Sequence, residues 1–299
     1  MGESNLIPKR IFYVWGATER KKRDVLACMQ TWRQILPEYE IIEINEESIQ
    51  YFNFQQELER NRWFKEVYER KLWAYVADYV RIKVLFDNGG IYLDTDVSVL
   101  KSFDNFLTCP AFVGMQNEEY VEPAILASKK GNPILGEILQ FYKRGIWEEP
   151  IYTMPQIFKR IFQARYGGMH FGPKKSQIIL KKADFVIFPE KYFIPYRYQD
   201  EYTPTCVEDE TVTIHWFQGS WLKQEAFDFL DNKHRLDSTV SKKNIISGTS
   251  WYFLKILKIL EKREVEGSFE YCVLGLPLLS INRNWVKIFG LKIVAIKRY

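Results

Sequence analysis

Residues 78–98 read DYVRIKVLFDNGGIYLDTDVS, and this stretch indicates the fold class. Its first part is mostly apolar, and we expect it to form a helix in which Asp78 and Arg81 lie one turn apart. Asn88-Gly89-Gly90 ends that helix, because glycine accepts the left-handed backbone that a helix C-terminus often needs. We expect a strand to follow over residues 91–99. A buried helix, a glycine break and a strand are typical of an α/β protein.

Two aspartates, Asp94 and Asp96, lie two residues apart in the predicted strand. Side chains at that spacing share one face of a strand, so the carboxylates would point the same way, roughly 7 Å apart along the chain. Like charges aimed at one place repel unless a cation lies between them. The pattern therefore predicts a divalent-metal site, and hard oxygen ligands favour Mg²⁺ or Mn²⁺.

The helix predicted over residues 71–87 carries apolar residues on nearly every side, which indicates a buried helix. On an exposed helix, Asp78 and Arg81 would be an i,i+3 ion pair worth a few tenths of a kcal/mol. Inside a protein such a pair is costly unless it binds something. We therefore interpret the pair as part of a site.

The N-terminal part predicts the start of a nucleotide-binding α/β fold. Residues 11–15 and 39–44 have the apolar character of buried strands, and residues 21–36 form an amphipathic helix between them. Such a unit is parallel and right-handed. Later segments predict further elements: one or two helices over 46–70, strands over 111–115, 118–128, 184–188 and 211–215, and helices over 134–143 and 151–165.

The composition is that of a globular protein with 46% hydrophobic and 27% charged residues in 299. A net charge of +4 argues against nucleic acid as a partner, and 16% aromatic residues favour a ligand that stacks on rings. Four widely spaced cysteines indicate free thiols. Residues 1–10 contain no apolar signal core, and no segment reaches ~20 uninterrupted apolar residues. We therefore expect a cytoplasmic protein.

The sequence changes character near its C-terminal end, so we expect a catalytic domain over residues 1–232 and an appendage over 233–299. Residues 233–250 are polar and linker-like, and residues 251–263 fit a basic amphipathic helix. Residues 274–283 resemble residues 289–298 and suggest a β-hairpin. This tail could lie on the anionic inner face of the cell membrane, or equally well form a packed appendage or a dimer contact.

An isolated Asp-x-Asp is common by chance, but here it follows Gly-Gly and an Asp-x-x-Arg helix. This combination resembles the Asp-x-Asp-containing sugar-binding glycosyltransferases of bacterial capsule and lipopolysaccharide loci (family 32-like). It is also similar to yeast-type initiating mannosyltransferases, to α1,4-galactosyltransferases and, more distantly, to the glucosyltransferase domains of clostridial toxins. The resemblance covers residues 7–221, including 11–16 and 32–40. It implies a GT-A fold, which is a Rossmann-like sandwich with a mixed, mostly parallel sheet that binds a nucleotide sugar and Mn²⁺ or Mg²⁺.

The resemblance also implies how the donor is bound. Trp15 would stack on the base, and Asn45, a poorer match, would touch it. Asp78 and Arg81 would contact the sugar hydroxyls and the phosphates, and Thr95 would also line the nucleotide-sugar site. From the residues alone, Trp15 could also belong to the core, but the glycine turn after it favours stacking.

The metal site that the resemblance implies is formed by residues from both ends of the domain. Asp94 would hold ribose or sugar and a metal-bound water, and Asp96 would bind the metal directly. His215 and Ser220 would complete the site, and Trp221 would close over the diphosphate. A metal and an indole N–H there would stabilise the charge that develops on the leaving group. A lone histidine is more often structural, so His215 is the less secure ligand.

These observations predict a metal-dependent, retaining hexosyltransferase. The donor is expected to be UDP-linked, with galactose or glucose first, N-acetylhexosamine open and GDP-mannose less favoured. Residues 118–128 and 169–173 are expected to select it. The acceptor is expected to be a lipid-linked oligosaccharide of capsular, exopolysaccharide or lipopolysaccharide synthesis. Two alternatives remain: an Asp-x-Asp phosphatase, whose motif normally lies on the first strand, and a non-catalytic sugar-binding component of an assembly complex.

Overall fold

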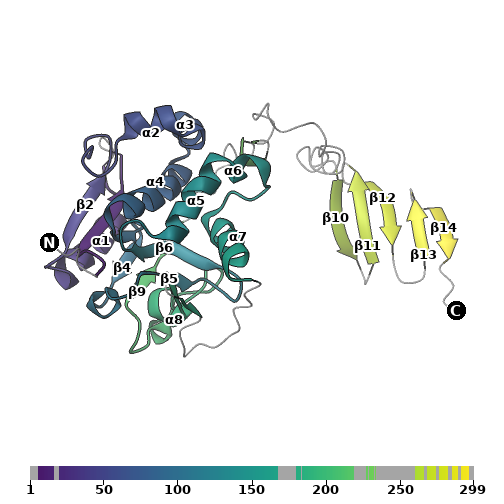
Figure 1. The fold of residues 1–299 in the computed structure, drawn as a ribbon. Helices are drawn as coiled ribbons and strands as arrows, with labels where there is room; N and C mark the ends of the chain where they lie inside the picture. Colours follow the sequence, from purple (N-terminus) through teal and green to yellow (C-terminus); the bar gives the residue numbers. More distant parts are fainter. Residues whose placement is uncertain are drawn as a thin grey trace. The chain divides into compact units, whose positions relative to one another are not determined.

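The computed structural model describes residues 6–16, 20–167, 180–182, 184–218, 227, 229–231 and 233, and five strands nearer the C-terminus (Figure 1). The chain divides into two compact units, Met1–Asp237 and Ser238–Tyr299. This division lies five residues beyond the one expected between residues 232 and 233. Lys233 is only 2% exposed and donates hydrogen bonds to the carbonyls of Ile146 and Glu149, so it packs in the first unit and not in a linker.

A seven-stranded sheet forms the centre of the first unit, in the order β2-β1-β3-β6-β5-β8-β7. β1, β2 and β3 are mutually parallel, β5 and β8 run the same way, and β6 and β7 are reversed. The predicted mixed, mostly parallel α/β sheet is therefore confirmed. The strands are β1 (Arg10–Val14), β2 (Glu40–Ile44), β3 (Gly90–Leu93), β5 (Ala111–Met115), β6 (Val121–Ser128), β7 (Leu180–Lys181) and β8 (Val186–Phe188).

Helices cover both faces of the sheet, because its strands bury side chains alternately on each side. On β1, Phe12 belongs to the core cluster beneath helices α4, α5 and α7, whereas Ile11 and Tyr13 belong to the cluster beneath α1. The helices are α1 (Arg23–Ile35), α2 (Phe54–Arg60), α3 (Arg62–Glu69), α4 (Trp73–Asn88), α5 (Pro133–Lys143), α6 (Gly145–Glu148), α7 (Met154–Tyr166) and α8 (Glu190–Phe193). Two short 3₁₀ turns, Asp104–Phe106 and Pro204–Cys206, complete the set in the described part of this unit.

The stretch from α4 to β4 differs from its prediction at one point. α4 ends at Gly89, which has a φ of +66° and donates to the carbonyl of Leu85, as a glycine break should. β3 then stops at Leu93, because the chain turns over residues 94–96 before β4 (Val97–Val99). β4 leaves the large sheet and pairs antiparallel with β9 (Thr213–His215). The prediction of one continuous strand over residues 91–99 was wrong, and both aspartates lie in a turn.

The second unit contains a five-stranded sheet in sequential order, with antiparallel neighbours. Its strands are β10 (Leu260–Val265), β11 (Ser268–Val273), β12 (Leu276–Ile281), β13 (Trp285–Ile288) and β14 (Leu291–Ala295). The prediction that residues 274–283 and 289–298 form a hairpin was wrong, because β13 lies between β12 and β14 in the sheet. Of the helix expected over residues 251–263, the last four residues belong to β10 and the rest lie outside the described residues.

Among the helices that the structure describes, none combines the length and apolarity that a membrane span requires. Cys28 and Cys206 are free thiols, as expected for these two cysteines.

Candidate functional site

Two carboxylates and an imidazole meet where β3 ends. The turn after β3 holds Asp94 and Asp96, and the pairing of β4 with β9 brings in His215, opposite Val97. One potential ligand atom from each of the three polar side chains lies within 4.8 Å of the others. His215 Nε2 is 3.3 Å from Asp96 Oδ1. The turn thus brings the two carboxylates together, although they do not share a strand face.

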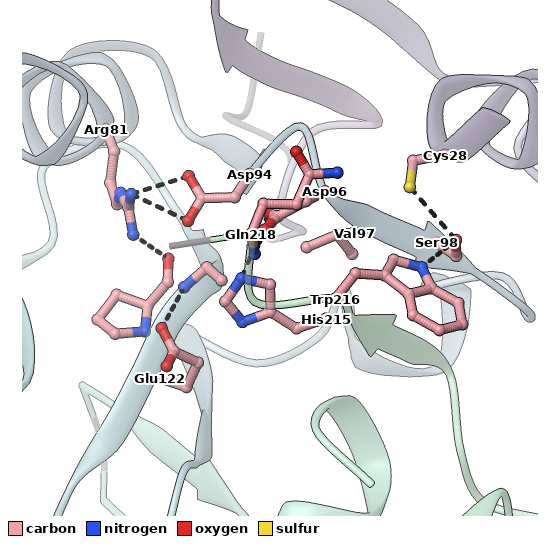
Figure 2. A network of polar contacts seen from close by, with 12 residues as sticks. Cys28, Arg81, Asp94, Asp96, Val97, Ser98, Glu122, His215, Trp216 and Gln218 are labelled. Carbon is pink, nitrogen blue, oxygen red and sulfur yellow. Dashed lines mark hydrogen bonds and ion pairs between the residues drawn. The ribbon is translucent and has the colours of Figure 1, made fainter. Parts of the chain in front are cut away.

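The chain that follows β9 holds Asp96 in place (Figure 2). The backbone N–H of Trp216 donates to the carbonyl of Asp96 at 3.0 Å, and that of Gln218 donates to its Oδ2 at 2.9 Å. Phe217 between them has a left-handed backbone, with φ of +50°, which is strained for a bulky residue. Its ring packs 4.2 Å from that of His215. Strain retained at this position is consistent with a site whose geometry is fixed.

Arg81 connects helix α4 to the same turn. Its Nη2 lies 2.9 Å from Asp94 Oδ1 and 3.2 Å from Asp78 Oδ1, and its Nη1 donates to the carbonyl of Pro123 at 2.7 Å. The guanidinium also lies 4.5 Å from the centre of the Tyr92 ring. Arg81 is only 5% exposed. Since its Nη groups already have protein partners, we interpret Arg81 as the group that fixes Asp94.

The charges of the site shift one another's pKa values. Burial raises the pKa of Asp78 to about 7 and also raises that of Asp94, although Arg81 opposes both changes. Burial acts the same way on Asp96, but His215 and the Gln218 N–H outweigh it and lower the pKa of Asp96. Burial disfavours the imidazolium form of His215, yet Asp96 more than compensates and raises the pKa of His215. Asp96 is therefore the carboxylate most fully ionised at neutral pH.

The donor set fits a divalent cation. Nδ1 of His215 is buried and has no hydrogen-bond partner among the described residues, although the residue is only 8% exposed. A buried ring nitrogen without a partner is uncommon and calls for an explanation. Carboxylates and an imidazole are common ligands of divalent metals, and Asp94 is itself oriented by its ion pair with Arg81.

Trp15 and Asn45 follow β1 and β2, which are parallel to β3, so both lie at the same edge of the sheet as Asp94. The N–H of Trp15 donates to the carbonyl of Ile44 at 3.3 Å, which joins the two strand ends. The Trp15 ring is partly exposed and lies 5.6 Å from Nζ of Lys21. The amide of Asn45, by contrast, already donates to Glu43 and accepts from the N–H of Glu47.

The remaining predicted residues divide into two groups. Thr95 lies in the turn between the two aspartates and is partly exposed. Ser220 and Trp221 lie outside the described residues, as do residues 169–173, so their roles stay predictions.

Glu122 was not predicted as a site residue. It lies at the start of β6, and its pKa is raised by burial and by Asp94, whereas His215 and Arg81 oppose the change. The sequence signal was available, because Glu122 is the single charged residue of the strand VEPAILAS, and the range 118–128 had been expected to contact the sugar.

Comparison with known proteins supports the predicted resemblance. Residues 22–113 match the model of the glycosyltransferase sugar-binding region containing a DXD motif. This range includes Asp78, Arg81, Asp94 and Asp96 and ends before Glu122. The resemblance to Asp-x-Asp-containing glycosyltransferases is therefore confirmed for this part of the chain.

Two curated relatives are inositol phosphoceramide mannosyltransferase 3 of Schizosaccharomyces pombe and lactosylceramide 4-alpha-galactosyltransferase of Rattus norvegicus. The first is 29% identical over 139 residues, covering 46% of this chain and 38% of its own. The second is 31% identical over 108 residues, covering 34% and 28%. The chain thus spans about a third of the length of these relatives. Both are eukaryotic, and the expected link to bacterial capsule loci stays a prediction.

Solved structures with some likeness are also glycosyltransferases by name. The PaToxG glycosyltransferase aligns with a TM-score of 0.45 at 21% identity, covering 55% of this chain and 71% of its own. The UDP-bound glycosyltransferase domain of the YGT toxin aligns with a TM-score of 0.34 at 12% identity, covering 55% and 68%.

Proposed function

We propose that the protein is a metal-dependent glycosyltransferase that moves a hexose or N-acetylhexosamine from a nucleotide sugar to a saccharide acceptor. The observation that carries this proposal is the meeting of Asp94, Asp96 and His215 at the carboxyl edge of β3. In α/β sheets this edge is where ligands bind. The match of residues 22–113 to the DXD sugar-binding region supports the same conclusion.

The donor would lie along this edge. Trp15, partly exposed at the end of β1, offers a ring for stacking on the base. The metal site at Asp94 and Asp96 would receive the diphosphate, because carboxylates attract a divalent cation that in turn binds phosphate oxygens. We favour a UDP-linked donor, with UDP-galactose or UDP-glucose first. Asn45 lies directly after β2, and its side-chain amide is already hydrogen-bonded to Glu43 and to the N–H of Glu47.

The reaction would proceed with retention. The bond between C1 of the sugar and the diphosphate oxygen breaks, and its electron pair stays on the leaving diphosphate. The acceptor hydroxyl forms the new bond to C1 on the same face and gives its proton to the leaving oxygen. A bound divalent cation supplies Lewis-acid stabilisation of the charge on the diphosphate. The chain's part is to keep Asp96 ionised through His215 and Gln218 and to fix Asp94 through Arg81.

For the acceptor we propose a lipid-linked saccharide, with the protein at the inner face of a membrane in polysaccharide synthesis. Residues 238–299 support contact with an anionic surface, since they contain 11 Lys and Arg against four Glu. The names of the two curated relatives include ceramide lipids, which fits an acceptor carried on a lipid.

The test is the thermal stability of the protein with Mn²⁺ and either UDP or GDP. We expect a nucleoside diphosphate to raise Tm when Mn²⁺ is present, and we expect Asp96→Ala to abolish this shift because it removes the most fully ionised metal ligand. Asp24→Asn, at an exposed position on α1, is the matched control and should behave as the wild type.

Absence of any shift with either nucleotide would contradict the transferase proposal. Turnover of a phosphomonoester in the same assay would favour the phosphatase alternative. Binding of UDP without transfer or hydrolysis of any nucleotide sugar would favour the non-catalytic alternative.

A further inference from the structure

Strand β6 has an irregularity beside the site. On β5, Val113 pairs with Leu126 of β6, but the next residue, Gly114, pairs with Glu122. Three residues of β6, 123–125, are therefore extra at this point. Such a bulge bends the strand and re-aims its side chains, and bulges are common next to active sites.

The bulge is fixed to the candidate site by two hydrogen bonds. The carbonyl of Ala124 accepts from the N–H of Asp94 at 2.9 Å, and the carbonyl of Pro123 accepts from Arg81 Nη1 at 2.7 Å. The two residues that follow Glu122, Pro123 and Ala124, are thus hydrogen-bonded to Arg81 and Asp94. Glu122 is consequently placed by the site and not by the sheet alone.

The Glu122 side chain faces the site (Figure 2). Its Oε1 accepts from the N–H of Ala124 at 3.3 Å, a long bond that leaves the carboxylate largely free for another donor. Burial raises the pKa of this carboxyl, and the charges of His215, Asp94 and Arg81 also act on it. Glu122 does not belong to the group of described residues whose ligand atoms lie together for a metal.

Two buried polar atoms of the site also point to a bound polar group. Both His215 Nδ1 and Arg81 Nε are buried and have no partner among the described residues, and the two side chains are 8% and 5% exposed. Buried donors and acceptors in proteins normally have partners. These two atoms are therefore available to a bound metal or ligand.

The sheet order determines which part of a nucleotide sugar would reach Glu122. β1 and β2, which carry Trp15 and Asn45, lie on one side of β3, whereas β6 lies on the other side. With the base at Trp15 and the diphosphate at the metal site after β3, the transferred sugar comes next, toward β6. A carboxylate repels the diphosphate but forms strong hydrogen bonds with neutral hydroxyl donors.

We propose that Glu122 binds hydroxyl groups of the transferred sugar and thereby selects which hexose the protein accepts. This inference rests on the proposed glycosyltransferase function. It places the sugar-selecting group on the bulge of β6, outside the DXD region that the family model matches.

The test compares Glu122→Gln with the wild type by calorimetry and by hydrolysis of donor. The ligands are Mn²⁺ with UDP, UDP-glucose, UDP-galactose, UDP-N-acetylglucosamine and UDP-N-acetylgalactosamine, or with GDP and GDP-mannose if GDP is the nucleotide that binds. Glu38→Gln is the matched control, because Glu38 is exposed, pairs with Lys9 and precedes β2, at the opposite end of that strand from Asn45. Glu122→Asp, which retracts the carboxylate by one methylene, is a second variant that keeps the charge.

We expect Glu122→Gln to bind Mn²⁺ and UDP with a Kd within about twofold of the wild type. For the preferred UDP-sugar we expect Kd to rise by about 10- to 100-fold, since hydrogen bonds to charged groups contribute about 1.5–3 kcal/mol. Discrimination among the sugars should fall in parallel. Glu122→Asp should lie between Glu122→Gln and the wild type, and Glu38→Gln should match the wild type.

Unchanged binding and hydrolysis of every sugar nucleotide by Glu122→Gln would overturn the inference while leaving the proposed function intact. An equal loss of affinity for the bare nucleotide and for the sugar nucleotide would also overturn it, because Glu122 would then serve the metal site. A wild-type protein that binds no nucleoside diphosphate would overturn both proposals together.

Discussion

Arg81 shows how one side chain can determine the geometry of a whole site. Its buried guanidinium contacts Asp78 on the same helix, Asp94 in the turn after β3, and the carbonyl of Pro123 on β6. A buried cation of this kind is stable only when every surrounding charge stays in place, because removal of one partner leaves an uncompensated charge. Burial raises the pKa values of Asp78 and Asp94, and the positive charge of Arg81 offsets only part of this rise.

This balance predicts a pH effect at Asp78. Its pKa is raised from 3.8 to about 7, so between these values the folded protein holds a proton that the unfolded chain has released. The free energy of unfolding should therefore fall as pH rises through this window. In Asp78→Asn this contribution is lost, and the stability difference between variant and wild type should change by about 1–3 kcal/mol between pH 5 and 8 in favour of the variant.

Urea unfolding at several pH values measures this difference. Asp24→Asn, at an exposed position on α1, is the control for the same exchange outside the site. Parallel curves for Asp78→Asn and the wild type would contradict a raised pKa at that position.

The junction between α4 and β3 determines where the aspartate turn lies. Gly89 has φ of +66°, and a Cβ there would lie 2.8 Å from the backbone nitrogen of Lys130. Gly90 has φ of +131°, and a Cβ there would lie 3.0 Å from the carbonyl of Arg10. Any side chain at these positions would separate β3 from its neighbours. The Gly-Gly pair is thus required both for its backbone angles and for close packing.

This geometry predicts different costs for two glycine substitutions. Gly131→Ala serves as the matched control, because Gly131 also has a positive φ, +72°, but nothing lies within 4 Å of its Cβ position. It should cost about 1 kcal/mol, the price of the left-handed backbone. Gly89→Ala should cost at least about 1–2 kcal/mol more, because the backbone of Lys130 must move. Chemical denaturation of both variants measures the difference, and equal costs would contradict the steric argument.

The charge of the whole chain is divided unevenly between its two units. Residues 238–299 carry a net charge of +7, whereas residues 1–237 carry −3. The candidate site belongs to the first unit, and the described part of the second unit is an antiparallel sheet. The division suggests that catalysis and attachment to an anionic surface belong to different units.

A protein of residues 1–237 tests this division. It should keep the Mn²⁺-dependent rise in Tm with UDP, because all described site residues are present. It should lose binding to vesicles rich in phosphatidylserine, since each basic residue near such a surface contributes about 1 kcal/mol. Thermal shift and vesicle sedimentation are the two measurements, with uncharged phosphatidylcholine vesicles as the control. Undiminished vesicle binding by the shortened protein would rule out the proposed attachment.

Most elements of the first unit could be predicted from the sequence, because they depend on local patterns. Continuous apolar runs indicated β1, β2 and β5, and the apolar helix with its glycine break indicated α4. The Asp-x-Asp motif indicated a metal site for the same reason, since its two carboxylates are neighbours in the chain. The tail was less predictable, because its alternating segments fit a hairpin as well as the five-stranded sheet.

By itself, the sequence determined the order of the strands and helices and the acid pair at Asp94 and Asp96. Tertiary structure decided how these residues meet. The turn at 94–96 exists because β4 leaves the large sheet to pair with β9, more than a hundred residues later in the chain. The same pairing brought His215 to Asp96, and a hydrogen bond from Asp94 to Ala124 joined the bulge of β6 to the aspartate turn. These contacts join residues that lie far apart in the chain, so no local pattern of residues indicates them.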